Sequence, residues 1–122
     1  MIRVMYVDDE PDIREIAEIS LSLDPGFEVR TANGGEAALA LAAEWRPDVA
    51  LLDVMMPGMD GPELLSRMRA EPALADLPVI FVTARAQKTE LQTFATLDAK
   101  GIIAKPFDPM TLSSQVRELA AA

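Results

Sequence analysis

Five polar residues stand where apolar runs of the chain end, and together they have the chemistry of a phosphoryl-transfer site. They are Asp8, Asp9, Asp53, Thr83 and Lys105. Apolar runs between turn residues are typical of buried parallel strands, and open α/β folds bind ligands at the carboxyl edge of such strands. We therefore expect three carboxylates, a hydroxyl and an ammonium on one rim of a sheet.

The three carboxylates predict a divalent cation. Clustered carboxylates repel one another, so at least one keeps its proton unless a cation neutralises the group. Mg²⁺ suits a site with few carboxylates, bound water and a substrate phosphate. A second interpretation stays open for Asp8 and Asp9, because acids before a helix also cap its backbone N–H groups.

Asp53 is the candidate nucleophile. A carboxylate attacks phosphorus only when a metal and a positive donor offset the charge on the phosphoryl oxygens. Lys105 can be that donor, and Thr83 can hydrogen-bond a phosphoryl oxygen. Taken singly, these residues could be a turn acid, a solvated lysine and a strand-end hydroxyl. Their joint placement at strand ends favours the site.

The rest of the sequence alternates five times between strand and helix patterns, which indicates a parallel sheet covered on both faces. The predicted strands are residues 2–7, 27–32, 48–53, 79–82 and 101–104. The predicted helices begin near Pro11, cover residues 36–44, 61–70 and 86–97, and begin again at Pro109. We predict an α/β, flavodoxin-like, doubly wound fold with five parallel strands in the order 2-1-3-4-5 and five flanking helices.

Residue spacing within the helices predicts their buried faces and caps. In the first helix the residues expected inside are Ile13, Ile16, Ala17, Ser20 and Leu21. At the last helix Asp108 is expected to cap the N-terminus, with Phe107 packing onto Leu112 across the cap. Trp45, the only tryptophan, is expected to be partly buried at the end of the sheet away from Asp53.

Composition limits the class of protein. A chain of 122 residues fits a single domain, so we expect residues 1–122 to form one. The net charge of −9 and the scattered basic residues predict no nucleic-acid partner. The absence of a signal segment, of a membrane-length apolar run and of cysteine predicts a cytoplasmic protein without membrane contact. Since there is no histidine, any phosphohistidine belongs to a partner.

The segments Val7-Asp8-Asp9-Glu10-Pro11, 52–61, Thr83-Ala84 and 104–109 resemble the receiver domain of two-component response regulators. The resemblance covers essentially the whole chain. It implies magnesium-dependent transfer of a phosphoryl group to Asp53 from the phosphohistidine of a sensor histidine kinase or histidine phosphotransfer protein. It also implies a signalling phosphoprotein rather than an enzyme with external substrates. The output would be a changed surface on the fourth helix, fifth strand and fifth helix.

By the same resemblance, the magnesium ligands are Asp9, Asp53 and the backbone carbonyl of Met55, with Asp8 acting mainly through water. Met55 and Arg85 would flank the phosphoryl position and tune water access, and hence the lifetime of the acyl phosphate. For Arg85 the simpler reading, that it begins the fourth helix, stays open. The family also implies a monomer, or a weak dimer on phosphorylation. A start at Met1, close to the first strand, favours a freestanding protein.

The resemblance further implies that Thr83, Lys105 and the Ala84 amide hold the phosphoryl oxygens and that Thr83 moves on phosphorylation. It implies a cis Lys105–Pro106 peptide bond. One residue departs from the family, because Ile102 stands where a tyrosine or phenylalanine is usual. We therefore hypothesise that the signal passes through backbone shifts in the fifth strand and fourth helix.

A second departure is Asp98, which stands where glycine is common, and it predicts an altered exit from the fourth helix. Two other functions stay open. A receiver-like binding module that signals without phosphate is compatible with Ile102. A metal-dependent phosphatase with an aspartyl nucleophile would need a second aspartate two residues after Asp53, where this chain has Met55. A flavin site is disfavoured because no phosphate-binding loop follows the first strand.

Overall fold

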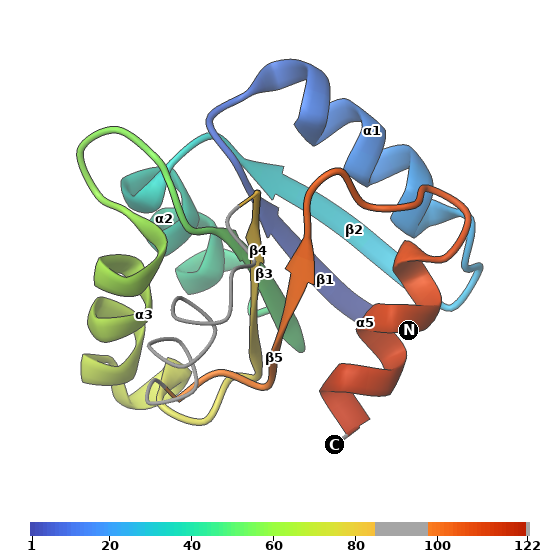
Figure 1. Ribbon diagram of the computed structural model, residues 1–122. Helices are drawn as coiled ribbons and strands as arrows, with labels where there is room; N and C mark the ends of the chain where they lie inside the picture. The colour runs from blue at the N-terminus through green and yellow to red at the C-terminus, as the bar shows by residue number, and fades with distance from the viewer. Residues whose placement is uncertain (85–97, 122) are drawn as a thin grey trace.

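The computed structural model describes residues 1–84 and 98–121 (Figure 1). Its elements, in chain order, are β1 (Ile2–Val7), α1 (Pro11–Ser22), β2 (Phe27–Ala32), α2 (Gly35–Glu44), β3 (Val49–Asp53), α3 (Gly61–Ala70), the 3₁₀ turn η1 (Pro72–Leu74), β4 (Val79–Thr83), β5 (Gly101–Ala104) and α5 (Leu112–Ala121). The strands form one parallel sheet in the order β2-β1-β3-β4-β5, which confirms the predicted fold. The predicted helix over residues 86–97 lies outside the described residues, as does Arg85.

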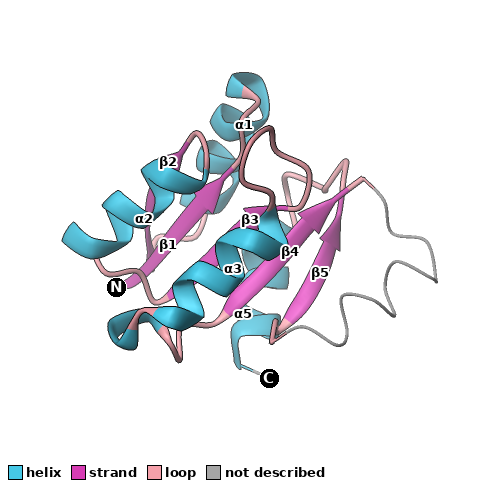
Figure 2. Ribbon diagram, turned by 90° about the vertical axis from the view of Figure 1, so that its left-hand side faces the viewer, coloured by secondary structure: helices cyan, strands magenta, loops and turns pink. Residues whose placement is uncertain are grey.

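Helices cover both faces of the sheet. One face packs against α1 and α5, and the other against α2 and α3 (Figures 1 and 2). Strands β3 and β4 are buried at every position because they lie in the middle of the sheet between these two layers. This two-sided burial explains why they appear in the sequence as continuous apolar runs rather than as alternating ones. In the described part of the chain, no helix is long and apolar enough to span a membrane.

The buried face of α1 is narrower than predicted. Ala17, Ser20 and Leu21 are buried, whereas Ile16 is 44% exposed. Ile16 precedes Ala17 by one residue and so lies about 100° further round the helix, at the border of the stripe that packs on the sheet. Ser20 is accommodated inside because its hydroxyl donates to the Ile16 carbonyl at 2.6 Å.

The regular part of α5 begins at Leu112, three residues later than predicted. The carboxylate of Asp108 accepts a hydrogen bond from the Met110 amide at 2.9 Å, and the Asp108 carbonyl accepts one from the Leu112 amide at 3.0 Å. Asp108 thus makes the bonds expected of a cap, but a turn over residues 109–111 stands between it and the helix.

Trp45 and Asp98, which lie outside the site, have surroundings that the sequence did not predict. Trp45 is 4% exposed rather than partly buried, because the guanidinium groups of Arg3 and Arg30 lie 5.6 and 5.0 Å from its ring centroid. Asp98 has no positive φ. Instead, Arg69 of α3 donates from Nε to the Asp98 carboxylate at 2.8 Å and from Nη2 to the Asp98 carbonyl at 2.9 Å. These two bonds hold the chain before β5.

Candidate functional site

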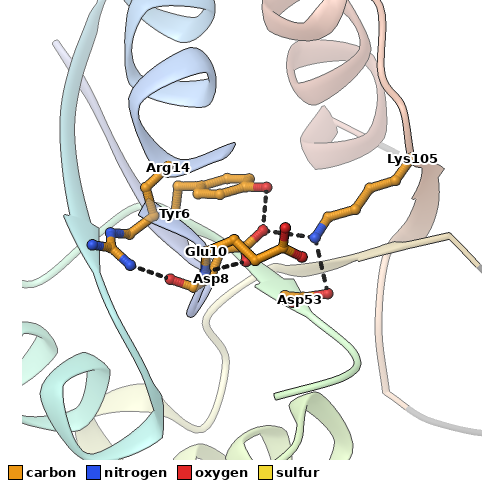
Figure 3. A network of polar contacts seen from close by, with 6 residues as sticks. All are labelled: Tyr6, Asp8, Glu10, Arg14, Asp53 and Lys105. Atoms are coloured by element: carbon orange, nitrogen blue, oxygen red, sulfur yellow. Dashed lines mark hydrogen bonds and ion pairs between the residues drawn. The ribbon is translucent and has the colours of Figure 1, made fainter. Parts of the chain in front are cut away.

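The carboxyl edge of the sheet brings the predicted polar residues together. Asp8 follows β1, Asp53 ends β3, Thr83 ends β4 and Lys105 follows β5. The register pairs Val7 with Leu52, Asp53 with Val82 and Thr83 with Ala104. Each of the four side chains therefore starts within about one residue of its neighbour on the adjacent strand. Figure 3 shows the network that connects two of the carboxylates to the lysine.

Lys105 bridges the two buried carboxylates. Its Nζ lies 2.7 Å from Asp8 Oδ2 and 3.3 Å from Asp53 Oδ1 (Figure 3). Asp8 is 0% and Asp53 4% exposed, so both charges depend on this ammonium rather than on water. The Lys105 amide donates to the Thr83 carbonyl at 2.8 Å. The Lys105–Pro106 peptide bond is cis.

Further hydrogen bonds hold Asp8 in place, among them one from its own amide to the Ala32 carbonyl at 3.1 Å. The Tyr6 hydroxyl donates to Oδ2 at 3.0 Å, and the Glu10 amide donates to Oδ1 at 3.0 Å. The guanidinium of Arg14 donates to the Asp8 backbone carbonyl at 2.9 Å. The cap position of α1 is occupied by Glu10, whose side chain makes no capping bond. Asp8 therefore faces the site instead of capping the helix.

A second acidic group lies beside this network. Asp8, Asp9 and Glu10 each offer one carboxylate oxygen, and these oxygens all lie within 4.8 Å of one another. Hard oxygen donors in this number suit Mg²⁺. Glu10 was not predicted as a site residue, and its position directly after the two aspartates is the signal that could have identified it.

The electrostatics of the site centre on Asp53. Burial and the charge of Asp8 raise the pKa of Asp53 to about 6, although Lys105 opposes the rise. Burial by itself lowers the pKa of Lys105. The hydrogen bond and negative charge of Asp8, together with Asp53, have the larger effect, so the pKa of Lys105 is raised. Burial, followed by the charge of Asp8, raises the pKa of the Tyr6 hydroxyl. The lysine is thus charged and the phenol protonated at neutral pH.

The loop after Asp53 is held close to the strand by α3. A Cβ at Gly61, the first residue of the helix, would lie 2.7 Å from the Asp53 carbonyl oxygen, so only glycine allows this approach. Asp60 caps α3, accepting a hydrogen bond from the Glu63 amide at 2.8 Å. The turn before it contains Gly58 at a φ of 78°, which disfavours other residues.

The remaining predicted site residues lie around this centre. The side chain of Met55 is 56% exposed, and its backbone hydrogen-bonds the Asp53 carboxyl. Ala84 is exposed directly after β4. Ile102 is half-buried and packs against the core cluster beneath α2 and α3. It therefore fills a core position rather than lying free on the surface.

Tyr6 is a further residue of this network that sequence reasoning missed. The sequence places it within the first predicted strand, residues 2–7, and it lies buried in β1. The available signal was its position two residues before Asp8, since residues i and i+2 of a strand point to the same face.

Comparisons with known proteins agree with this geometry. The probable transcriptional regulator ycf27 of Guillardia theta is 39% identical over 115 residues, which are 94% of this chain and 44% of that protein. The regulator RpaA of Synechocystis sp. is 35% identical over 98% of this chain and 49% of its own length. The structure of the chemotaxis protein CheY4 of Vibrio cholerae matches with a TM-score of 0.89 and 34% identity over 98% of both chains.

These relatives correct one prediction. The acidic composition predicted no nucleic-acid partner, whereas RpaA is named a DNA-binding transcriptional regulator and ycf27 a probable transcriptional regulator. The prediction is wrong because the charge of one domain does not describe contacts made elsewhere in a longer protein. This chain spans about half the length of the curated relatives it matches.

The family comparison covers nearly the whole sheet. The model of the response regulator receiver domain matches residues 4–117, from β1 into α5. That range contains every strand end that contributes to the site, and CheY4 shares both the fold and the extent of this chain. The chain belongs to the family of response regulator receiver domains.

Proposed function

We propose that this chain is a phosphoacceptor switch in which Asp53 accepts a phosphoryl group from the phosphohistidine of a sensor kinase or phosphotransfer protein. The observation that carries the proposal is the position of Lys105, whose ammonium lies between Asp53 and Asp8 at the carboxyl edge of the sheet. At that place the ammonium can contact the carboxylate before transfer and the oxygens of the phosphoryl group after it.

The chemistry assigned to Asp53 is nucleophilic attack. One carboxylate oxygen forms a bond to phosphorus while the bond between phosphorus and the donor imidazole nitrogen breaks, so the imidazole leaves with the electron pair. Lys105 offsets the charge on the phosphoryl oxygens, together with the Thr83 hydroxyl and the Ala84 amide. Because Lys105 already contacts Asp53, the attacking group and the stabilising charge are positioned before the donor arrives.

Magnesium is the cofactor that the donor set fits. Asp8, Asp9 and Glu10 offer clustered oxygens, and Asp53 and the Met55 carbonyl would complete the set. When bound, the ion neutralises phosphoryl charge that the carboxylates would otherwise repel. Lys105 and the hydrogen bonds to Asp8 fix the orientation of the Asp8 carboxylate, so the site is organised to receive a cation.

The output would be the surface of the predicted fourth helix, β5 and α5, of which the fourth helix lies outside the described residues. Residues 1–122 would act as one receiver domain, alone or within a longer regulator. The names of ycf27 and RpaA favour a transcriptional output, in which a DNA-binding region outside this sequence responds to the receiver. The chain would modify itself only and turn over no external substrate.

Intact-mass measurement tests the acceptor assignment. The protein is incubated with acetyl phosphate and Mg²⁺, beside Asp53→Asn, a chelator control and Asp60→Asn. Asp60→Asn is the matched control, because it changes an aspartate of the same loop to a residue that also caps helices. We expect a mass gain of one phosphoryl group in the parent and in Asp60→Asn, and none in Asp53→Asn or with chelator. Hydroxylamine should remove it, as expected for an acyl phosphate.

A negative result would be checked with a phosphorylated histidine kinase as donor. If the parent still gains no phosphoryl group, the phosphoacceptor function is refuted, and the binding module that signals without phosphate becomes the better description. Ile102 favours the binding module as the second candidate function, because this isoleucine replaces the family's aromatic switch residue. Phosphorylation of Asp53→Asn at the parent rate would instead assign the acceptor to another residue.

A further inference from the structure

Tyr6 connects the hydrophobic core to the acidic site. It is the only tyrosine of the chain and lies in β1, two residues before Asp8. The residue is 0% exposed, and its hydroxyl oxygen is 3.0 Å from Asp8 Oδ2 (Figure 3). An ionised carboxylate can only accept hydrogen bonds, so the phenol is the donor.

The Tyr6 hydroxyl supplies a contact that Lys105 cannot supply alone. Lys105 is shared between Asp8 and Asp53, and in the proposed function it turns toward a phosphoryl group. The Tyr6 hydroxyl and the Glu10 amide bind different oxygens of the Asp8 carboxylate. Together these two donors define the orientation of the Asp8 carboxylate whether or not Lys105 remains in contact with it. Without Tyr6, a buried oxygen would lose its last donor when the lysine moves.

Packing fixes the direction of the hydroxyl. The Tyr6 ring meets the Phe107 ring edge to face, with centroids 6.4 Å apart and planes at 72°. Phe107 in turn packs against the core cluster beneath α1 and α5. A tyrosine ring has two side-chain torsions, and a ring enclosed in this way has little freedom in either. The hydroxyl is therefore aimed at Asp8 before any ligand binds.

We propose that Tyr6 is a positioning residue for the metal centre, whose hydroxyl holds the Asp8 carboxylate where it can join Asp9 and Glu10 around one magnesium ion. The inference rests on the proposed function, because it presupposes that magnesium binds here. Outer hydrogen-bond partners of metal-binding groups typically contribute about 10- to 100-fold to metal affinity. We therefore expect Tyr6→Phe to weaken magnesium binding by about 10-fold.

Calorimetric titration of the parent, Tyr6→Phe and Phe107→Leu with Mg²⁺ tests the proposal. Tyr6→Phe removes the hydroxyl and keeps the ring, while Phe107→Leu removes the ring contact and keeps the hydroxyl. Circular dichroism establishes that each variant is folded. The expected result is clearly weaker binding in Tyr6→Phe and a smaller loss in Phe107→Leu, which loosens the ring but keeps the hydroxyl. In the parent, the NMR signal of the ¹³C-labelled Cζ of Tyr6 should shift as Mg²⁺ is added. The dissociation constant from this shift should equal the one from calorimetry.

Four results would overturn the proposal. Equal affinity of Tyr6→Phe and the parent would show that the hydroxyl does not position Asp8. Equal weakening in Tyr6→Phe and Phe107→Leu would assign the effect to general packing. A phosphorylation rate in Tyr6→Phe that stays below the parent at saturating Mg²⁺ would place the effect on phosphoryl transfer instead. If the parent binds no magnesium at all, the proposed cofactor fails first, and the inference fails with it.

Discussion

Asp53→Asn should make the metal-free protein more stable at neutral pH, and the size of the gain should depend on pH. Burial and the charge of Asp8 raise the pKa of Asp53 from 3.8 to about 6 in the folded state. The folded protein therefore holds a proton on this carboxyl more tightly than the unfolded chain does. Ionising Asp53 costs folding free energy, and the neutral amide of asparagine avoids that cost.

The sign and the pH window follow from this raised pKa. Below pH 3.8 the carboxyl is protonated in both states, so there is no cost. Between pH 3.8 and about 6 the folded state keeps the proton and the unfolded state loses it, so stability falls as pH rises. Above about pH 6 the full cost is present. At about 1.4 kcal/mol per pKa unit, its upper bound is about 3 kcal/mol.

Asparagine recovers only part of that amount. The attraction to Lys105, 3.3 Å away, is already included in this pKa, but the amide NH₂ group that replaces one carboxylate oxygen cannot accept the hydrogen bonds that this oxygen accepted. We expect a gain of about 1–3 kcal/mol above pH 7, which falls toward zero near pH 4. This gain corresponds to a rise of several degrees in Tm.

Urea denaturation followed by circular dichroism, in the presence of chelator and at several pH values, measures this gain. Asp76→Asn is the control, because Asp76 is exposed in the turn before β4, at the other end of the strand from the site. Its effect should be small and independent of pH. The reasoning is refuted if Asp53→Asn is no more stable than the parent at pH 7.5, or if its gain is the same at pH 4 and pH 7.5.

Three other predictions concern the metal and the loop that follows Asp53. Magnesium at 100 times its dissociation constant should stabilise the parent by about 2.7 kcal/mol in thermal melts, and Asp9→Asn should lose most of that gain; an unchanged gain would remove Asp9 from the ligand set. Gly61→Ala should lower the free energy of unfolding by about 1–3 kcal/mol, because its Cβ would meet backbone atoms of Asp53 and Val54. Gly34→Ala has open space and is the control, so equal losses in urea denaturation would contradict the clash. Asp60→Ala should lower stability by about 1 kcal/mol through loss of the α3 cap, while Asp60→Asn should retain the parent's stability.

The strands were predictable because their sequence signal is local. A parallel strand covered on both faces needs apolar residues at consecutive positions, and β3 and β4 show this directly. The helix details were less predictable, because they depend on what each helix meets. Ile16 has the same apolar character as its buried neighbours, and only the width of the contact with the sheet leaves it exposed.

For the site, the sequence by itself determined which chemistry is present and where along the chain it stands. Asp8, Asp53, Thr83 and Lys105 could be assigned to one sheet edge because each follows an apolar run, and parallel strands end at a common edge. The absence of histidine likewise means that any phosphohistidine donor lies outside this sequence. These conclusions need only residue type and order.

Only the tertiary structure decided how the charges are shared. Lys105 and Asp8 are 97 residues apart, and no local pattern shows that the lysine lies closer to Asp8 than to Asp53. The same holds for the contact of the Tyr6 hydroxyl with Asp8 and of its ring with Phe107. Hydrogen bonds, buried charges and raised pKa values depend on distances of a few ångströms between segments that meet only after folding. A sequence lists the groups, but packing sets those distances.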